Sequence, residues 1–286
     1  MRSFKKYLSL VKFAHTVFAL PFAAIGYTLG AIQPDQHPDI FLFLKVILCM
    51  VFARTSAMAF NRWADRAIDA KNARTKVREI PSGAISSKAA LALVILSSLL
   101  FILTTYFINR LCFYLSPVAL LVVLGYSYTK RFTWLCHLVL GLGLSLAPIG
   151  AYLAITSRFD WLPLFFSFIV ITWVSGFDII YALQDDEFDK SEKLYSIPTF
   201  FGRKNALLFS SVLHFISITF VVIAGLSGTF NNLYWVGAAL FAGLVVYQHT
   251  LIKPNDLSKV NLAFFTMNGI ASIVFATFVI LAGVLN

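Results

Sequence analysis

Two polar segments of an otherwise apolar sequence carry acidic residues at a spacing of four. Asn61, Asp65 and Asp69 stand in the stretch NRWADRAID, and Asp185 and Asp189 stand in the stretch DDEFD. Residues four apart on an α-helix differ by only about 40° around its axis. We therefore expect each set to form a stripe along one face of a helix, beginning while the preceding apolar helix is still running.

The second stripe starts deeper in its apolar run. Asp178 stands seven residues before Asp185, and Tyr181 lies beside the stripe. Ionisable residues inside apolar spans commonly have a function. We predict a catalytic role for Asp178 and a substrate contact for Tyr181. A private structural hydrogen bond is the alternative for Asp178.

Clustered carboxylates repel one another unless a cation lies among them. Mg²⁺ takes oxygen ligands and binds through one or two carboxylates together with substrate phosphates. If the two stripes face each other, five aspartates surround one cavity, in which two Mg²⁺ ions would bridge a diphosphate. Solvated helix ends are the alternative for either stripe alone, and the occurrence of both favours the metal site. The predicted metal ligands, which we also expect to act in catalysis, are Asn61, Asp65, Asp69, Asp185 and Asp189.

Basic residues near the stripes would supply positive charge for phosphate oxygens. Arg62 and Arg66 stand within the first segment. Lys130 and Arg131 follow Tyr126 at the end of the fourth apolar run. We predict that all five residues bind substrate.

Arg54 stands seven residues before Asn61 and so lies inside an apolar run, on the same helical face. An unpaired charge at such a depth costs at least about 2.5–3.5 kcal/mol. We expect Arg54 to pair with a substrate carboxylate or with the acidic stripe. The alternative is that its side chain extends to the membrane interface.

The composition indicates an integral membrane protein. Of 286 residues, 59% are hydrophobic and 13% are charged, whereas soluble domains carry about 25% charged residues. A helix crosses the hydrocarbon with about 20 apolar residues. Nine runs of this kind predict nine membrane spans, at residues 10–32, 40–61, 88–108, 112–128, 134–156, 161–183, 205–224, 233–252 and 262–284.

The placement of basic residues predicts the orientation of these spans. With a cytoplasmic N-terminus, 19 of the 23 Lys and Arg residues lie on inner segments. This bias is typical of cytoplasmic loops and predicts an N-in, C-out topology. The net charge of +10 is thereby explained by topology, and no nucleic-acid-binding module is indicated.

The domain organisation is also suggested by the pattern of spans. Each acidic segment follows an even-numbered span, and four spans separate the two segments. We expect two four-helix halves with a ninth helix appended. The three cysteines, Cys49, Cys112 and Cys136, form no C-x-x-C pair and indicate neither a disulfide framework nor a zinc site.

Together these motifs resemble the UbiA superfamily of intramembrane aromatic prenyltransferases, in particular its 4-hydroxybenzoate polyprenyltransferase branch. The resemblance covers the whole chain, through HTVFALPFA, NRWADRAID, REIPSG, GYSYTKR, FDIIYALQDDEFD and SIPTFFG. The chain departs from the family pattern at Ala73, where many members have proline, and at Lys193, where many have glycine. Both positions fall in inner loops that would cap the cavity.

The resemblance implies a single transmembrane domain over residues 1–286, with its helices bundled around a central cavity that opens to the bilayer. It implies Mg²⁺-dependent transfer of a polyprenyl group from a polyprenyl diphosphate to a ring carbon of an aromatic acid. Both acidic motifs match those of the family. Tyr126, Lys130 and Arg78 match its substrate-binding positions. No obligate protein partner is implied.

The expected acceptor resembles 4-hydroxybenzoate, in respiratory quinone biosynthesis at the cytoplasmic side of a bacterial inner (plasma) membrane. A dihydroxynaphthoate, in the menaquinone route, is the alternative acceptor. Outside the enzymes, a membrane transporter is the main alternative, because intramembrane acids also mark ion pathways. Transporter sites lie near the bilayer midplane on broken helices, whereas the acids here gather at one membrane boundary, which favours the enzyme.

Overall fold

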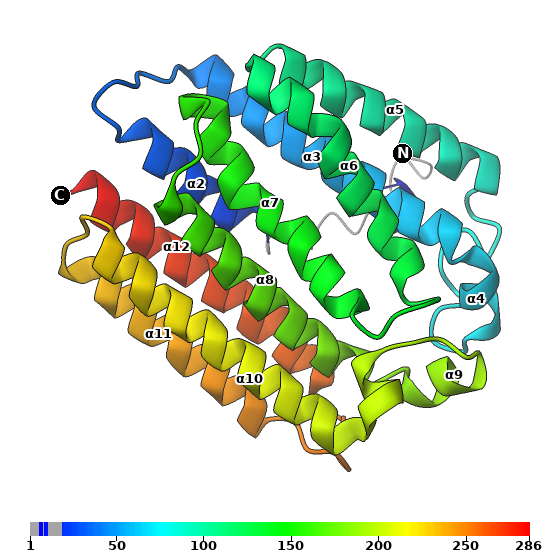
Figure 1. The fold of residues 1–286 in the computed structure, drawn as a ribbon. Coiled ribbons are helices and arrows are strands. Elements are labelled where there is room, and N and C mark those ends of the chain that lie inside the picture. The colour runs from blue at the N-terminus through cyan, green and yellow to red at the C-terminus, as the bar shows by residue number, and fades with distance from the viewer. Residues whose placement is uncertain (1–5, 8, 11–18) are drawn as a thin grey trace. The chain divides into compact units, whose positions relative to one another are not determined.

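The computed structural model describes residues 6, 7, 9, 10 and 19–286 and shows a set of α-helices joined by short connections (Figure 1). Within these residues there is no β-strand, and the one bridge is an isolated pairing of Lys253 with Asp256. The all-α prediction is confirmed. The helices fall into two compact units.

The first unit contains residues 40–129 and the described residues that precede position 11. Three long helices pack against one another in pairs, and a short helix follows the first of them (Figure 1). The Ser86 hydroxyl caps the second long helix by accepting a hydrogen bond from the Ala89 N–H. The helices are α3 (Ile40–Ala64), α4 (Arg66–Lys71), α5 (Ser87–Tyr106) and α6 (Arg110–Thr129).

The second unit contains the described part of residues 17–39 and residues 130–286. Its most extensive helix pairs are α8 with α10, α7 with α8, α2 with α7, and α11 with α12. The helices are α2 (Leu20–Ala31), α7 (Cys136–Thr156), α8 (Trp161–Ala182), α9 (Asp186–Ser191), α10 (Ile197–Ser227), α11 (Asn232–Thr250), the π-helix η2 (Leu262–Met267) and α12 (Asn268–Val284).

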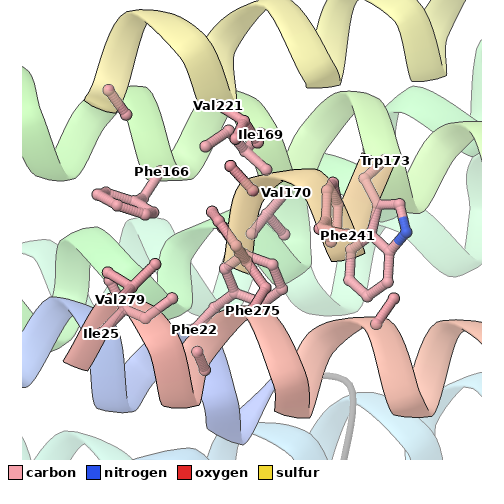
Figure 2. Packing of buried hydrophobic residues seen from close by; sticks show 14 of the residues in the cluster. Phe22, Ile25, Phe166, Ile169, Val170, Trp173, Val221, Phe241, Phe275 and Val279 are labelled. Atoms are coloured by element: carbon pink, nitrogen blue, oxygen red, sulfur yellow. The ribbon is translucent and has the colours of Figure 1, made fainter. Parts of the chain in front are cut away.

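Aromatic side chains fill the core of the second unit (Figure 2). The Trp173 ring on α8 lies 5.4 Å from the Phe22 ring of α2 and 5.7 Å from the Phe241 ring of α11. Phe241 in turn lies 5.0 Å from Phe275 of α12, measured between ring centroids. These four rings are almost fully buried and join four helices that are far apart in the sequence.

Small residues bring neighbouring helices of this unit close together. Lipid is as apolar as a leucine side chain, so membrane helices associate largely through close van der Waals packing at small residues. A Cβ atom added to Gly26 of α2 would lie 1.9 Å from the Pro148 carbonyl oxygen of α7. One added to Gly176 of α8 would lie 2.4 Å from the His214 ring of α10. Both helix pairs depend on the absence of a side chain.

Among the described residues, seven helices are long and apolar enough to cross a membrane, and they coincide with seven of the nine predicted spans. The predicted span 233–252 coincides with α11, a helix of 19 residues that is less apolar at its C-terminal end. The predicted span 10–32 lies partly outside the described residues, and its described part holds the 12-residue helix α2. Nine spans and the N-in, C-out orientation stay predictions.

The expected division into two four-helix halves and an appended ninth helix is wrong. α2, from the first predicted span, belongs to the second unit, where it packs against α7 and α12. The first unit has three long helices among its described residues. The periodic placement of acidic segments along the sequence therefore does not show which helices pack together.

Candidate functional site

The first acidic motif lies where a membrane helix gives way to a short helix. α3 ends at Ala64, Asp65 has φ −91° and ψ 1°, and α4 begins at Arg66. The prediction of one uninterrupted helix is therefore wrong at Asp65. The stripe nevertheless persists, because the Asp65 N–H donates to the Asn61 carbonyl at 2.9 Å and the Asp69 N–H donates to the Asp65 carbonyl at 2.8 Å.

Two further hydrogen bonds anchor the head of this motif. Asn61 Nδ2 donates to Asp65 Oδ2 at 3.2 Å, which confirms that these side chains are neighbours. The same amide donates to the Ser127 hydroxyl of α6 at 3.5 Å. The end of α6, where Tyr126 was expected to contact substrate, is thus brought to the first motif. Ser127 gave no sequence signal of its own beyond its place beside Tyr126.

Asp69 has one carboxylate oxygen in an ion pair and the other without a partner. Its Oδ1 accepts a hydrogen bond from Arg78 Nη1 at 2.7 Å. Its Oδ2 is buried and finds no hydrogen-bond partner among the described residues. A buried, unpaired carboxylate oxygen is costly unless a cation or donor reaches it. This oxygen, the Asp65 carboxylate and the Asn61 amide oxygen form a hard-oxygen donor set that fits Mg²⁺.

One buried and one half-buried arginine lie in the same unit. Arg62 is 5% exposed, and its Nε has no hydrogen-bond partner among the described residues. It lies within electrostatic range of Asp69, Glu79 and Arg78. Arg54 is half-buried, and its Nε likewise has no hydrogen-bond partner within the part of the chain that the structure describes. Guanidinium groups with free donors at such sites are suited to binding phosphate or carboxylate oxygens.

Arg66 points to a different environment. It is exposed, its guanidinium carbon lies 4.8 Å from the centroid of the Trp63 ring, and its Nη1 donates to the Trp63 carbonyl at 2.6 Å. These contacts are made at the surface of the helix junction. The predicted contact of Arg66 with phosphate stays a prediction.

The second acidic motif repeats the backbone arrangement of the first. α8 ends at Ala182, Asp185 has φ −112° and ψ 2°, and α9 begins at Asp186. The Asp189 N–H donates to the Asp185 carbonyl at 2.7 Å. Asp178 lies within α8, whereas Asp185 lies beyond its end, so the predicted continuous stripe from Asp178 to Asp189 is interrupted.

Asp178 has a histidine partner that the sequence did not indicate. His137 Nδ1 lies 2.7 Å from Asp178 Oδ2, and His137 is 3% exposed. The backbone N–H of Ile197 donates to His137 Nε2 at 3.4 Å. Because Nε2 accepts a hydrogen bond, Nδ1 carries the proton that is donated to Asp178. Forty-one positions separate the two residues, so no short-range spacing could reveal this pair.

Tyr181 lies in an aromatic group beside the π-helix. Its ring stacks on Phe264 with centroids 4.1 Å apart. The buried Asn268 holds this region, because its Nδ2 donates to the carbonyls of Ala263 and Phe264 at 3.1 Å. π-helical turns often occur near functional sites. Here the π-helix places Phe264 against Tyr181, which stands one helical turn before the second motif.

The segment after α9 is tied to Lys130. The Tyr195 N–H donates to the Lys130 carbonyl at 2.7 Å, and the Leu194 N–H donates to the Asp189 carbonyl at 2.8 Å. Lys130 and Arg131 directly follow α6 in the chain but belong to the second unit. Their predicted role in binding phosphate is consistent with this proximity to the second motif.

The structure thus assembles each half of the predicted site within its own unit. The first unit brings together Asn61, Asp65, Asp69, Arg62 and Arg78. The second unit brings the Asp185 motif close to the backbone of Lys130. No group of three or more His, Cys, Asp or Glu residues that could hold a metal by itself occurs in the described ranges. That both motifs line one cavity stays a prediction.

Comparison with known proteins identifies the family. Residues 19–270 match the UbiA prenyltransferase family. A 4-hydroxybenzoate octaprenyltransferase from Aliivibrio salmonicida is 32% identical over 270 residues, covering 93% of this chain and 90% of the relative. A protein of the same name from Francisella tularensis subsp. novicida is 30% identical over 255 residues, covering 88% of this chain and 89% of the relative.

Solved structures show the same fold. The apo structure of a UbiA homologue from Aeropyrum pernix K1 matches with a TM-score of 0.81 and 28% identity, covering 95% of this chain and 97% of that one. A UbiA homologue from Archaeoglobus fulgidus, bound to DMAPP and Mg²⁺, matches with a TM-score of 0.74 and 23% identity, covering 96% and 99% of the two chains. At that identity the second match shows the fold alone. The chain therefore belongs to the UbiA prenyltransferase family and is an integral membrane transferase.

Proposed function

We propose that this protein transfers a polyprenyl group from a polyprenyl diphosphate to a ring carbon of a 4-hydroxybenzoate-like aromatic acid, in respiratory quinone biosynthesis. The observation that carries the proposal is that the first unit holds a buried acceptor atom and a buried donor atom, both without a hydrogen-bond partner among the described residues. The buried Asp69 Oδ2 has no hydrogen-bond partner among the described residues, and neither has Nε of the buried Arg62 nearby. The first atom suits a cation and the second suits an anion, as a metal diphosphate provides.

The names of the relatives support the same reaction. Two relatives at 32% and 30% identity that match most of this chain are called 4-hydroxybenzoate octaprenyltransferases. We propose that the metal is Mg²⁺ and that both acidic motifs hold it around one diphosphate. When bound, Mg²⁺ would neutralise the negative charge that develops on the departing diphosphate. The ligands would be Asn61, Asp65, Asp69, Asp185 and Asp189.

The protein's own residues would act on the two substrates in different ways. Arg62 and Arg78 would bind and orient the diphosphate oxygens, and Lys130 would add a further positive charge. The bond between the allylic carbon and the diphosphate oxygen breaks, and a bond between that carbon and the aromatic ring forms. The ring then loses one proton to a base. Asp178, held in place by His137, is our candidate for that base.

The buried position of the reaction serves two purposes. A pocket among membrane helices excludes water, which would otherwise capture the allylic cation. The prenyl chain is itself soluble in lipid and reaches such a pocket from the bilayer. Arg54, ten residues before the end of α3, would bind the carboxylate of the aromatic acid. The positive-inside bias supports a site at the cytoplasmic side of a bacterial inner membrane.

One assay tests the reaction and the acceptor together. Purified protein in lipid nanodiscs would receive Mg²⁺, a radiolabelled polyprenyl diphosphate and either 4-hydroxybenzoate or a dihydroxynaphthoate. We expect a labelled lipid product with 4-hydroxybenzoate that disappears when EDTA is added. Product only with the naphthoate would change the acceptor and retain the chemistry. Absence of product with both acceptors would refute the proposal.

A further inference from the structure

The short helix α9 begins directly after Asp185, contains Asp189, and needs support from contacts outside itself. It has six residues, Asp186–Ser191, and helices of this length are not stable by themselves. Successive residues of an α-helix are rotated by about 100° around its axis, so unwinding or adding a single residue turns the following side chains by about this angle. The direction of Asp189 relative to Asp185 therefore depends on whatever fixes α9.

Arg203 supplies such a contact. Its Nε donates to Asp186 Oδ2 at 2.7 Å, and its Nη2 donates to Asp186 Oδ1 at 2.8 Å. The same Nη2 also donates to Glu187 Oε1 at 3.1 Å. The Asp186 side chain is only 14% exposed, whereas that of Glu187 is 89% exposed. The two-pronged, partly buried bond to Asp186 thus fixes both position and direction, and the Glu187 contact adds little.

The backbone around Arg203 is built to present it. Ser196 and Thr199 form a capping box at the start of α10. Gly202 then interrupts the helix with φ 79° and ψ 163°, a conformation that residues other than glycine rarely adopt. Arg203 is the first residue after this break. Its side chain emerges at the point where the long part of α10 begins, next to α9.

The other end of α9 is held by the backbone. The Leu194 N–H donates to the Asp189 carbonyl, and the Tyr195 N–H donates to the Lys130 carbonyl. α9 is consequently fixed at Asp186 by a side chain and at Asp189 by the main chain. Of these two attachments, the one at Asp186 can be removed by substitution of a single residue outside the acidic motif.

We propose that Arg203 is a positioning residue that, through Asp186, sets the direction in which Asp185 and Asp189 offer their carboxylates to the metal. The inference rests on the proposed function, since it takes the second motif to be a metal site. Mg²⁺ demands near-ideal octahedral geometry. Loss of contacts behind the metal ligands commonly weakens metal affinity by about 10–100-fold.

Metal binding can be measured separately from catalysis. Mn²⁺ would be titrated into purified protein in nanodiscs and free Mn²⁺ followed by electron paramagnetic resonance. We expect Arg203→Gln to weaken Mn²⁺ binding by about 10-fold. Arg203→Lys keeps the positive charge but loses the planar two-pronged geometry, and it should weaken binding less. Lys204→Gln, the exposed neighbour, is the matched control and should bind as the unchanged protein does.

The exchange variant Asp186→Arg with Arg203→Asp distinguishes positioning from general instability. It restores an ion pair of opposite polarity, so Mn²⁺ affinity should recover most of what Asp186→Arg alone loses. In activity assays, Arg203→Gln should raise the Mg²⁺ concentration for half-maximal rate and leave the KM for the aromatic acid unchanged. Hydrogen exchange of residues 183–195 should increase in the same variant.

The outcomes separate the two proposals. Mn²⁺ affinity within twofold of the unchanged protein in both Arg203→Gln and Arg203→Lys would overturn the positioning role. If Arg203→Gln does not fold, Arg203→Lys and the exchange variant decide, and failure of the exchange to restore affinity also counts against the role. If the unchanged protein binds Mn²⁺ through Asp185 but transfers no prenyl group, the proposed function fails while the positioning role stands.

Discussion

Asp178 of α8 and His137 of α7 form a partly buried hydrogen bond of 2.7 Å between Oδ2 and Nδ1. The bond joins two neighbouring helices of the second unit and leaves the second carboxylate oxygen of Asp178 for another partner. His137 receives a further hydrogen bond from the Ile197 backbone at Nε2, so its ring is fixed from both sides. Asp178 is held in one orientation, as a proton acceptor in the reaction would have to be.

Substitutions in this pair should separate stability from activity. Asp178→Asn can still accept the hydrogen bond from His137, so we expect little change in the thermal unfolding midpoint but a loss of turnover of about 100-fold or more. His137→Ala leaves a partly buried carboxylate without its donor and should lower the free energy of unfolding by about 1–3 kcal/mol. Thermal unfolding and the labelled-product assay measure both. Full turnover of Asp178→Asn would reduce Asp178 to a structural role.

Asp69 should be more important for metal binding than for stability. Asp69→Asn keeps an oxygen for Arg78 but removes the charge from the buried, unpartnered oxygen. We expect Mn²⁺ affinity and turnover to fall by about 10-fold or more, with little change in the unfolding midpoint. Asp256→Asn, at an exposed acid outside both motifs, is the control. Equal Mn²⁺ binding by the two variants would exclude Asp69 as a ligand.

Arg54 should govern the affinity for the aromatic acid. A charge-assisted hydrogen bond contributes about 1.5–3 kcal/mol, so Arg54→Gln should raise the KM for 4-hydroxybenzoate by roughly 10–100-fold. The KM for the prenyl diphosphate should not change. Lys45→Gln, on the same helix, removes a donor to the Phe107 carbonyl and should alter neither value. A uniform rise of both KM values in Arg54→Gln would assign this arginine to the diphosphate instead.

The contact of α2 with α7 should not tolerate a methyl group at Gly26. A Cβ there would overlap the Pro148 carbonyl oxygen, so the helices must move apart. We expect Gly26→Ala to destabilise the protein by about 1–3 kcal/mol. Gly150→Ala, on α7 where an added Cβ meets no atom within 4 Å, is the matched control. Equal unfolding midpoints of the two variants would contradict the close contact.

Replacement of Lys193 by glycine should stabilise the protein. It has φ 56° in the connection between α9 and α10, a left-handed conformation that costs a residue with a side chain about 1–2 kcal/mol. We expect Lys193→Gly to raise the free energy of unfolding by about 1 kcal/mol. Lys190→Gly, inside α9, should lower it by a similar amount. A destabilising effect of Lys193→Gly would show that its side chain makes contacts that outweigh the strain.

Local patterns predicted the parts of this protein that depend on neighbours in the chain. The four-residue spacing of Asn61 and Asp65 predicted side chains in contact, and their hydrogen bond confirms it. Seven apolar runs predicted helices of membrane-spanning length. The departure at Lys193, where relatives often have glycine, marks a left-handed backbone position. In each case the relevant interaction lies within a few residues.

Local sequence patterns could not predict which residues of different helices contact one another. His137 and Asp178 are 41 positions apart, and Arg203 and Asp186 are 17 apart, so periodicity gives no reason to join them. The breaks at Asp65 and Asp185 were also missed, because apolar runs fade gradually into polar sequence and do not mark the residue at which a helix ends. The assignment of α2 to the second unit depends on packing at Gly26 and Phe22, which composition alone does not reveal.

The placement of α2 also sets an order of assembly. Its packing partners are α7 and α12, and roughly 100 residues lie between the end of α2 and the start of α7, which take roughly 5–20 s to synthesise. The helices of the first unit follow one another directly and can pack as they leave the ribosome. α2 can therefore complete its packing only after α7 has been made, and the second unit is complete only when α12, the last helix, has been made.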